Sequence, residues 1–323
     1  MPGLLEVKHL QTHFHTRGGV VKAVDGVSFS IEEGETVGMV GESGSGKSVT
    51  ALSIMRLIAS PPGEIVEDSE IMFRGENVLE MSVEELHELR GGKIAMIFQD
   101  PMTSLNPVYS VGSQIAEAVK THLNLTSRAA TERALEMMKR VRIPDARRRL
   151  KSYPHEFSGG MRQRVMIAIA LSCNPQLLIA DEPTTALDVT IQAQILDLIK
   201  ALSKESHTSV LLITHDLGVV AGMCQRVLVM YAGRVIEEAS TPQLFSKPAH
   251  PYTQGLLRSI PRLEDTQQQR LIPIKGQPPD LVNLPPGCPF VPRCPKAQER
   301  CRVELPKLGL VDENQRAACF YPF

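Results

Sequence analysis

The decapeptide GESGSGKSVT, residues 41–50, places three glycines and two serines ahead of a lysine. It matches the P-loop pattern G-x-x-x-x-G-K-S and stands between a predicted strand and a predicted helix, as that pattern requires. Glycines let the backbone curl so that several N–H groups face one anion, and the helix N-terminus adds the positive end of its dipole. Lys47 would reach the outer phosphates and the Ser48 hydroxyl would bind magnesium. A flexible Gly/Ser turn is the alternative, but the full pattern favours a nucleoside triphosphate site.

A second group of reactive side chains follows apolar runs. The sequence LLIADEP, residues 177–183, ends an apolar segment with two carboxylates. A buried strand of an open α/β sheet delivers such residues to the carboxyl edge, where ligands bind. There Asp181 can hold the magnesium shell and Glu182 can polarise a water in line with the terminal phosphate. Two further apolar runs bring Gln99 and His215 to the same edge. Each residue alone could simply cap a strand, but the four together with a P-loop favour one catalytic site.

Strands and helices alternate in the segments that must position these residues. Continuous apolar runs predict buried parallel strands, and alternating residues near the N-terminus predict half-exposed ones. Helical periodicity fills the segments between them. This alternation indicates an α/β fold with a mainly parallel sheet that is covered on both faces. The predicted strands are 4–10, 27–31, 36–40, 69–75, 93–99, 176–181, 209–214 and 226–238, and predicted helices begin at about 47, 190 and 217.

The pattern changes twice along the chain. From about residue 100 to 173 it is helical, which predicts an inserted helical subdomain. Past about residue 245 it is crowded with proline, which cannot continue the strands and helices, so we expect an extended arm that packs on the core or leads away from it. The predicted division is therefore one domain over 1–245 and a C-terminal extension over 246–323.

Composition narrows the class of protein. The 323 residues carry 35 basic and 36 acidic side chains and a formal net charge of −1, so no global field draws the chain to nucleic acid. No apolar run approaches the ~18 residues that span a bilayer, and the first residues lack the apolar core of a signal peptide. We therefore expect a cytosolic chain, in which the six cysteines are thiols or metal ligands and not disulfides.

Four of the six cysteines fall close together near the C-terminus. They follow the pattern C-x5-C-x6-C-x17-C. Four thiolates on a short irregular segment suit a tetrahedral zinc or a [4Fe–4S] cluster, and the spacing leaves both open. Four reduced structural thiols are the third possibility. The residues are Cys288, Cys294, Cys301 and Cys319.

The motifs together resemble the ATP-binding subunits of ABC transporters. FSGGMRQRVMIAIAL from Phe157 resembles the family signature, and LLIADEP, TALD (185–188) and His215 follow in the family's order and spacing. The resemblance covers roughly residues 4–245. It implies the P-loop NTPase fold of an ABC nucleotide-binding domain, with a RecA-like core, an antiparallel β subdomain and an inserted helical subdomain. The sequence departs from the family where Met161 replaces the usual glutamine.

The resemblance also implies how the motifs share their work. Two cassettes face each other head to tail, and each ATP lies between one P-loop and the opposite signature. Catalysis is expected from Glu182, His215, Lys47 and Gln99, and magnesium binding from Ser48, Gln99 and Asp181. ATP binding is expected from Phe14, Gly41, Glu42, Ser43, Gly44, Ser45, Gly46, Lys47, Ser48 and Val49. The partner's ATP would contact Ser158, Gly159, Gly160 and Asp188.

Three histidines stand close together near the N-terminus, namely His9, His13 and His15. They could form a metal cluster, but no cysteine or carboxylate accompanies them, so this hypothesis is the weaker one.

Two stretches narrow the resemblance to one branch of the family. FQDPMTSLNPVYSVGSQI (98–115) and HPYTQGLLRSIP (250–261) resemble importers of oligopeptides, dipeptides and nickel, and the chain is similar to the D-type ATPase subunit of dipeptide importers. This branch implies a second ATPase subunit, two permease subunits and an extracytoplasmic peptide-binding protein. It places the chain on the cytoplasmic face of a bacterial or archaeal inner membrane, and it favours a [4Fe–4S] cluster, with zinc as the alternative, in the cysteine-rich tail.

The expected activity is therefore ATP hydrolysis that powers peptide import. The same motor could serve another cargo, such as nickel or glutathione. A soluble ABC ATPase of DNA repair or translation is a rival, although the chain has no long coiled-coil insertion, no second cassette and no basic surplus for nucleic acid. A P-loop GTPase or kinase would leave FSGGM and ITHD (213–216) unexplained.

Overall fold

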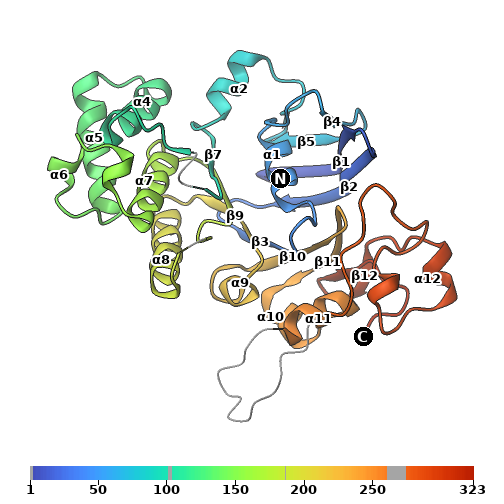
Figure 1. The fold of residues 1–323 in the computed structure, drawn as a ribbon. Helices are drawn as coiled ribbons and strands as arrows, with labels where there is room; N and C mark the ends of the chain where they lie inside the picture. Colours follow the sequence, from blue (N-terminus) through green and yellow to red (C-terminus); the bar gives the residue numbers. More distant parts are fainter. Residues whose placement is uncertain (1–2, 101–103, 186, 260–273) are drawn as a thin grey trace, which may run out of the picture. The chain divides into compact units, whose positions relative to one another are not determined.

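The computed structural model describes residues 3–100, 104–185, 187–259 and 274–323. Parts of three motifs lie outside these residues, namely 101–103, Ala186 and 260–261. The chain forms two compact units (Figure 1). The first unit comprises Met1–Ile31, Thr36–Leu79 and Ile213–Phe323, and the second comprises Glu32–Glu35 and Glu80–Leu212.

The first unit contains an antiparallel sheet near the N-terminus. Its long strands β1 (Leu5–Thr16) and β2 (Gly19–Ile31) pair from Leu5↔Ile31 to Thr16↔Gly19. Apolar and polar residues alternate along both strands, so one face is buried and the other is exposed. The remaining strands, in the order β2-β1-β5-β6 with β4 also on β1, are β4 (Gly63–Ile65), β5 (Glu70–Phe73) and β6 (Glu76–Asn77).

The second sheet of the first unit carries the P-loop strand. β3 (Thr36–Val40) pairs in parallel with β10 (Arg226–Tyr231), which forms an antiparallel hairpin with β11 (Arg234–Ser240). The single strand predicted over 226–238 is thus wrong. Ala232 and Gly233 both have positive φ, 48° and 77°, and two such residues form the tight turn that suits a two-residue hairpin.

The proline-rich extension also joins this sheet, which the sequence did not predict. β13 (Gln315–Ala317) pairs with β11, and β12 (Gly309–Asp312) pairs with β13. This hairpin lies in a segment with few prolines, so its N–H groups can join the ladder. The helices of the first unit are α1 (Lys47–Ile54), α9 (Leu217–Met223), α10 (Thr241–Ser246), α11 (Pro251–Arg258), the 3-10 turn η2 (Val291–Arg293) and α12 (Glu299–Val303).

The second unit combines buried strands with the predicted helical block. Its strands have the order β9-β8-β7, and β7 (Ile94–Ile97) is parallel to β8 (Leu177–Asp181), while β9 (Ser209–Thr214) extends past Leu212 into the first unit. The helical block is present, and α8 follows it. These helices are α4 (Val111–Leu123), α5 (Ser127–Arg140), α6 (Ala146–Arg149), η1 (Pro154–Glu156), α7 (Gly159–Leu171) and α8 (Val189–Glu205), and α2 (Val83–Leu89) precedes them.

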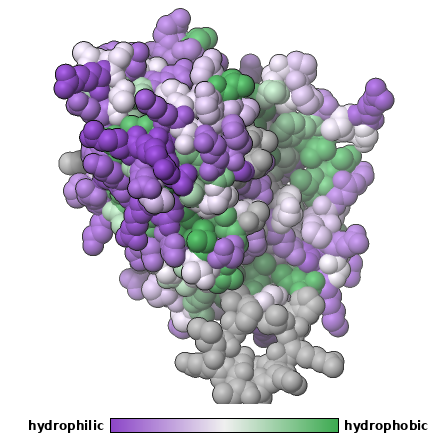
Figure 2. All heavy atoms as spheres, turned by 60° about the vertical axis from the view of Figure 1, so that its left-hand side comes forward, coloured by the Kyte–Doolittle hydropathy of each residue, from purple (hydrophilic) through white to green (hydrophobic). Residues whose placement is uncertain are grey.

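The hydropathy of the surface and of the helices is the feature that concerns membranes. Figure 2 shows one face on which hydrophilic side chains predominate and hydrophobic ones form separate patches. Across the described residues, no helix has both the length and the apolar character that crossing a bilayer requires.

Candidate active site

The P-loop of the first unit is built as the sequence predicts. β3 ends at Val40, α1 begins at Lys47, and the loop between them is 41–46. Gly46 has a φ of +103°, and a Cβ added there would lie 2.4 Å from the carbonyl oxygen of Ala23. Only glycine fits such a position, because it combines left-handed backbone with close approach of another chain segment.

Lys47 is folded into the loop that it follows. Its side chain is buried, at 5% exposure. Nζ donates hydrogen bonds to the carbonyl oxygens of Gly41 at 2.8 Å and Glu42 at 2.9 Å, and it lies 3.4 Å from Ser45 Oγ. Ser43 and Gly44 are exposed at the tip of the loop, and Ser48 and Val49 are half-buried in the first turn of α1. A cation and a helix N-terminus thus converge on one concave stretch of backbone, the arrangement that binds phosphate.

In the second unit, two carboxylates follow β8. Asp181 is its last residue and is only 5% exposed. Glu182 has a φ of 45°, a left-handed conformation that costs energy for a residue with a Cβ. Glu182 Oε2 accepts hydrogen bonds from Gln99 Nε2 at 3.2 Å and from Thr185 Oγ1 at 2.9 Å. The structure therefore brings Gln99 and Glu182 together, and it adds Thr185, which the sequence placed only within the TALD motif.

The signature residues occupy the start of a long helix. Ser158 is the N-cap residue of α7, and its exposed side chain makes no capping hydrogen bond. Gly159 is exposed and Gly160 is half-buried. Asp188 caps α8 by accepting a hydrogen bond from the backbone N–H of Ile191 at 3.0 Å. Ser158 and Gly159 at the N-terminus of α7 are thus exposed, and the first turn of a helix carries N–H groups that have no intrahelical partner and the positive end of the dipole.

The other two predicted residues belong to the first unit. His215 follows β9 and is exposed. Phe14 is half-buried on β1, where it pairs with Val21 and Gly63. Of the neighbouring histidines, His15 Nε2 lies 2.7 Å from Glu64 Oε2.

The residues predicted to bind magnesium have suitable chemistry. Ser48, Gln99 and Asp181 would offer a hydroxyl, an amide and a carboxylate oxygen, the hard ligands that magnesium prefers. Asp181 is almost completely buried, and a buried carboxylate is stabilised by a nearby cation.

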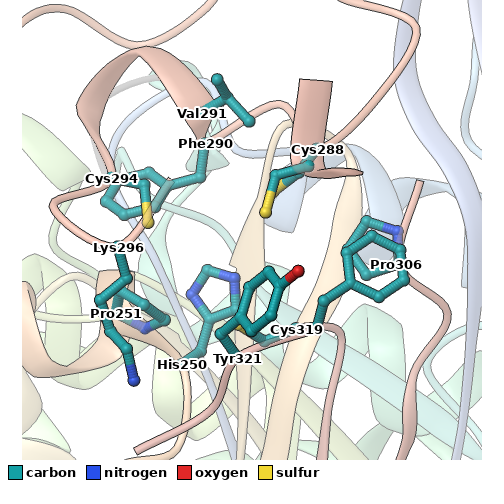
Figure 3. A pocket seen from close by; sticks show the side chains of 12 residues that line it. His250, Pro251, Cys288, Phe290, Val291, Cys294, Lys296, Pro306, Cys319 and Tyr321 are labelled. Carbon is teal, nitrogen blue, oxygen red and sulfur yellow. The ribbon is translucent and has the colours of Figure 1, made fainter. Parts of the chain in front are cut away.

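The four tail cysteines do line one pocket, but it is not a metal centre. Figure 3 shows Cys288, Cys294 and Cys319 around a pocket that Cys301 also lines. Within the described ranges, which include all four, no group of three or more His, Cys, Asp or Glu side chains could hold a metal ion. The prediction of a [4Fe–4S] cluster is therefore wrong, as are the zinc alternative and the histidine cluster.

The surroundings of the cysteines explain this result. The cavity has a volume of about 20 Å³, which is room for roughly one water molecule and not for a cluster. Burial raises the pKa of Cys288 to about 11 and also raises the pKa of Cys294 and of Cys319. None of the four cysteines forms a disulfide.

Two family models match the chain. The ABC transporter model matches residues 24–185. The model of the C-terminal region of oligopeptide/dipeptide transporters matches residues 236–301.

Curated relatives align along nearly the whole chain. The probable peptide ABC transporter ATP-binding protein y4tR of Sinorhizobium fredii is 55% identical over 317 residues, which cover 98% of this chain and 94% of the relative. The oligopeptide transport ATP-binding proteins AppD of Bacillus subtilis and OppD of Escherichia coli are each 52% identical, and the alignments cover 99% of this chain and 97% and 93% of theirs.

Solved structures agree with the architecture. The ATP-binding cassette MJ0796, solved as a post-hydrolysis dimer bound to ADP and phosphate, matches with a TM-score of 0.66 at 28% identity, covering 73% of this chain and 98% of that one. CbiO1 of Clostridium perfringens, part of the ABC transporter complex cbiONQ, matches with a TM-score of 0.63 at 27% identity, covering 75% and 90%. The present chain therefore belongs to the ABC transporter ATP-binding proteins, in the branch with the oligopeptide/dipeptide C-terminal region. The matches show this, and the P-loop and the signature helix of the chain agree with it.

Proposed function

We propose that this chain is the ATP-hydrolysing subunit that powers import of dipeptides and oligopeptides through an ABC transporter. One observation carries the chemistry, namely that Gln99 and Thr185 hold the Glu182 carboxylate at the end of a buried strand. The family membership supports the activity, and the peptide transport named for the relatives y4tR, AppD and OppD supports the cargo.

ATP binds at the P-loop in this proposal. Lys47 exchanges its carbonyl acceptors for the outer phosphate oxygens, and other N–H groups of the loop and of the first turn of α1 donate hydrogen bonds to the remaining phosphate oxygens. Phe14 stacks on adenine. Ser48, Gln99 and Asp181 would hold magnesium, which would supply positive charge close to the phosphates.

Glu182 is the catalytic base that takes a proton from the attacking water. Gln99 and Thr185 fix the direction in which its carboxylate points, and a fixed base contributes because the water need not be reoriented during the reaction. His215 supports the terminal phosphate and the water. The work of the site is therefore positioning and charge neutralisation.

The catalytic unit is a pair of cassettes. The exposed N-terminus of α7, with Ser158, Gly159 and Gly160, closes on the ATP of a second ABC ATPase subunit, together with Asp188. The dimeric state of the solved cassette MJ0796 supports this arrangement. ATP closes the pair, and hydrolysis reopens it.

The pair acts on two permease subunits at the cytoplasmic face of the inner membrane. An extracytoplasmic peptide-binding protein delivers the peptide to these permease subunits. The described part of the segment after Gln99 exposes Val108 (71%) and Tyr109 (56%), apolar side chains that suit docking of a permease helix. In this proposal residues 1–245 are the motor, with a helical subdomain over about 100–173, and 246–323 are the extension.

The test compares wild type with Glu182→Gln. The variant should bind ATP normally and lose turnover by about 10²-fold or more, because general-base catalysis typically contributes 10²–10⁴-fold. Glu132→Gln on the exposed face of α5 is the matched control. Turnover of Glu182→Gln within a few-fold of wild type would refute the role of Glu182.

Uptake of a labelled dipeptide by a deletion strain tests the cargo. Rescue by wild type and not by Glu182→Gln supports the peptide importer. If the deletion leaves dipeptide uptake intact, nickel and glutathione are the next cargoes to test. Binding to membranes only when the permease is present would support the importer subunit, and no membrane binding in its presence would favour the soluble ABC ATPase instead.

A further inference from the structure

The C-terminal extension contacts the P-loop through one arginine. Arg293, at the end of η2, has a side chain that is only 3% exposed. Its Nη1 and Nη2 donate hydrogen bonds to Oε2 and Oε1 of Glu42 at 2.6 Å and 2.9 Å. Two parallel bonds between a guanidinium and a carboxylate fix direction as well as distance. The second residue of the P-loop is thus tied to a residue 251 positions later in the chain.

The other donors of Arg293 hold it in place within the first unit. Nε donates to the carbonyl oxygen of Lys275 at 3.1 Å, and Nη2 to that of Ile274 at 3.5 Å, while Nη1 lies 3.4 Å from the Tyr231 hydroxyl. The five N–H groups of a guanidinium therefore all have an acceptor nearby. The hydrogen bonds to Glu42 raise the pKa of Arg293, so the side chain stays a cation at every physiological pH.

Glu42 is held on three sides. Its side chain pairs with Arg293, and its backbone N–H donates to the Tyr252 hydroxyl at 2.8 Å. Its carbonyl oxygen accepts the bond from Lys47 Nζ at 2.9 Å. Tyr252 is fully buried on α11 and packs against Tyr231 with ring centroids 4.6 Å apart. Two residues of the extension thus set the orientation of the backbone to which the P-loop lysine bonds.

Charge gives this contact a consequence for anion binding. A carboxylate in a loop that binds polyphosphate repels the ligand, and the repulsion is strong where water is partly excluded. An unpaired Glu42 would also compete with phosphate for Lys47. The bidentate pair with Arg293 cancels the charge and keeps the carboxylate turned toward the extension.

We propose that Arg293 is a positioning residue for the P-loop, which neutralises Glu42 and holds its backbone so that nucleotide binding depends on the C-terminal extension. The proposal rests on the proposed function, because it takes the P-loop to bind ATP. It assigns to the extension a role in the ATP site of its own chain.

The test measures the Kd of a nonhydrolysable ATP analogue for four full-length proteins, namely wild type, Arg293→Met, Glu42→Gln and the double variant. Arg293→Met should raise the Kd on the order of tenfold, about 1.4 kcal/mol, because it leaves Glu42 charged and unpaired. Glu42→Gln is the reference protein, because its P-loop carries no carboxylate that could repel the analogue. The double variant should match Glu42→Gln, so that removal of the carboxylate rescues the loss of the arginine.

A merely structural role for Arg293 predicts the opposite, since the double variant would bind no better than Arg293→Met. That result would overturn the inference while leaving ATP binding by wild type, and hence the proposed function, intact. Wild type that binds no nucleotide would overturn both. The loss in Arg293→Met should also shrink as salt is raised, because ions screen the repulsion.

Two further variants keep the test decisive. Arg302→Met is the matched control, because Arg302 lies in the same extension, is 62% exposed and forms a long ion pair with Glu299, at 3.7 Å. The Kd of this variant should equal that of wild type. If Arg293→Met does not fold, Arg293→Lys replaces it, which keeps the charge and loses the bidentate geometry. The proposal is supported if Arg293→Lys raises the Kd less than Arg293→Met would and if adding Glu42→Gln removes this rise. A rise in Kd that persists in the double variant of Arg293→Lys and Glu42→Gln overturns the proposal.

Discussion

Glu237 of β11 is a buried carboxylate that connects the extension to the sheet. It is fully buried. Oε1 accepts hydrogen bonds from the backbone N–H of Ala249 and from Gln315 Nε2, and Oε2 accepts one from the backbone N–H of His250, all at 2.8 Å. Ala249 and His250 lead into α11, and Gln315 lies on β13. One side chain therefore joins β11 to two separate segments.

Glu237→Gln changes the shape of this side chain very little, so its effect isolates the hydrogen bonds. An amide offers one oxygen and one NH2 group, and in the better orientation the NH2 group faces the N–H of His250. That donor is then stranded, and the other two bonds lose their charged acceptor. A hydrogen bond to a charged group contributes about 1.5–3 kcal/mol and a stranded buried donor costs about 1–3 kcal/mol. We expect the free energy of unfolding to fall by about 2–4 kcal/mol.

Urea unfolding, together with amide hydrogen exchange in α11, measures this loss. Glu304→Gln is the control, because Glu304 is 53% exposed and pairs with Arg300 on the surface of the same extension; such a pair contributes at most about 1 kcal/mol. A loss in Glu237→Gln below about 1 kcal/mol, or equal to that of Glu304→Gln, would show that the three bonds do not carry the attachment.

Two further predictions concern the hydrogen bond of Thr185 and the burial of His250. Thr185→Val removes the hydrogen bond to Glu182 Oε2, so ATP turnover should fall about tenfold while ATP affinity stays unchanged. Thr185→Ser keeps the hydroxyl and should retain wild-type turnover. Equal turnover in the two variants would exclude a positioning role for Thr185. Burial lowers the pKa of His250 to about 3, against about 6.5 in the unfolded chain. Below pH 6.5 the unfolded chain therefore binds a proton at His250 that the folded chain does not bind. The free energy of unfolding is thus highest above pH 6.5 and falls as the pH drops toward 3. Between pH 6.5 and 5 wild type should lose about 2 kcal/mol more than His250→Asn in urea unfolding, and parallel curves would contradict this.

Local pattern predicted much of the fold and of the site. Glycine spacing and flanking apolar runs located the P-loop, because φ > 0 and close backbone approach leave no other residue type. The helical period located the α4–α7 block, since an amphipathic helix records in its own sequence which face it buries. Asp181 and Glu182 were placed at a strand end for the same local reason. These features depend on residues that are neighbours in the chain.

The sequence failed where a feature depends on distant partners. The apolar run 226–238 predicts one strand, because the turn at Ala232 and Gly233 is visible only once the two halves pair. The proline-rich tail predicts an extended arm that packs on the core or leads away from it, yet its β12–β13 hairpin pairs with β11 and joins the sheet. The four tail cysteines predicted a metal centre because spacing shows which atoms are available but not how deeply they are buried.

The sequence by itself thus determined which chemical groups the protein carries and the family to which it belongs. Only the tertiary structure decided the state of those groups. Glu42 was assigned to the P-loop from its position, but its pairing with Arg293 requires a fold that brings together residues 251 positions apart. Burial raises the pKa of tail thiols, and carboxylates acquire partners, through contacts whose geometry the linear pattern of residues does not show.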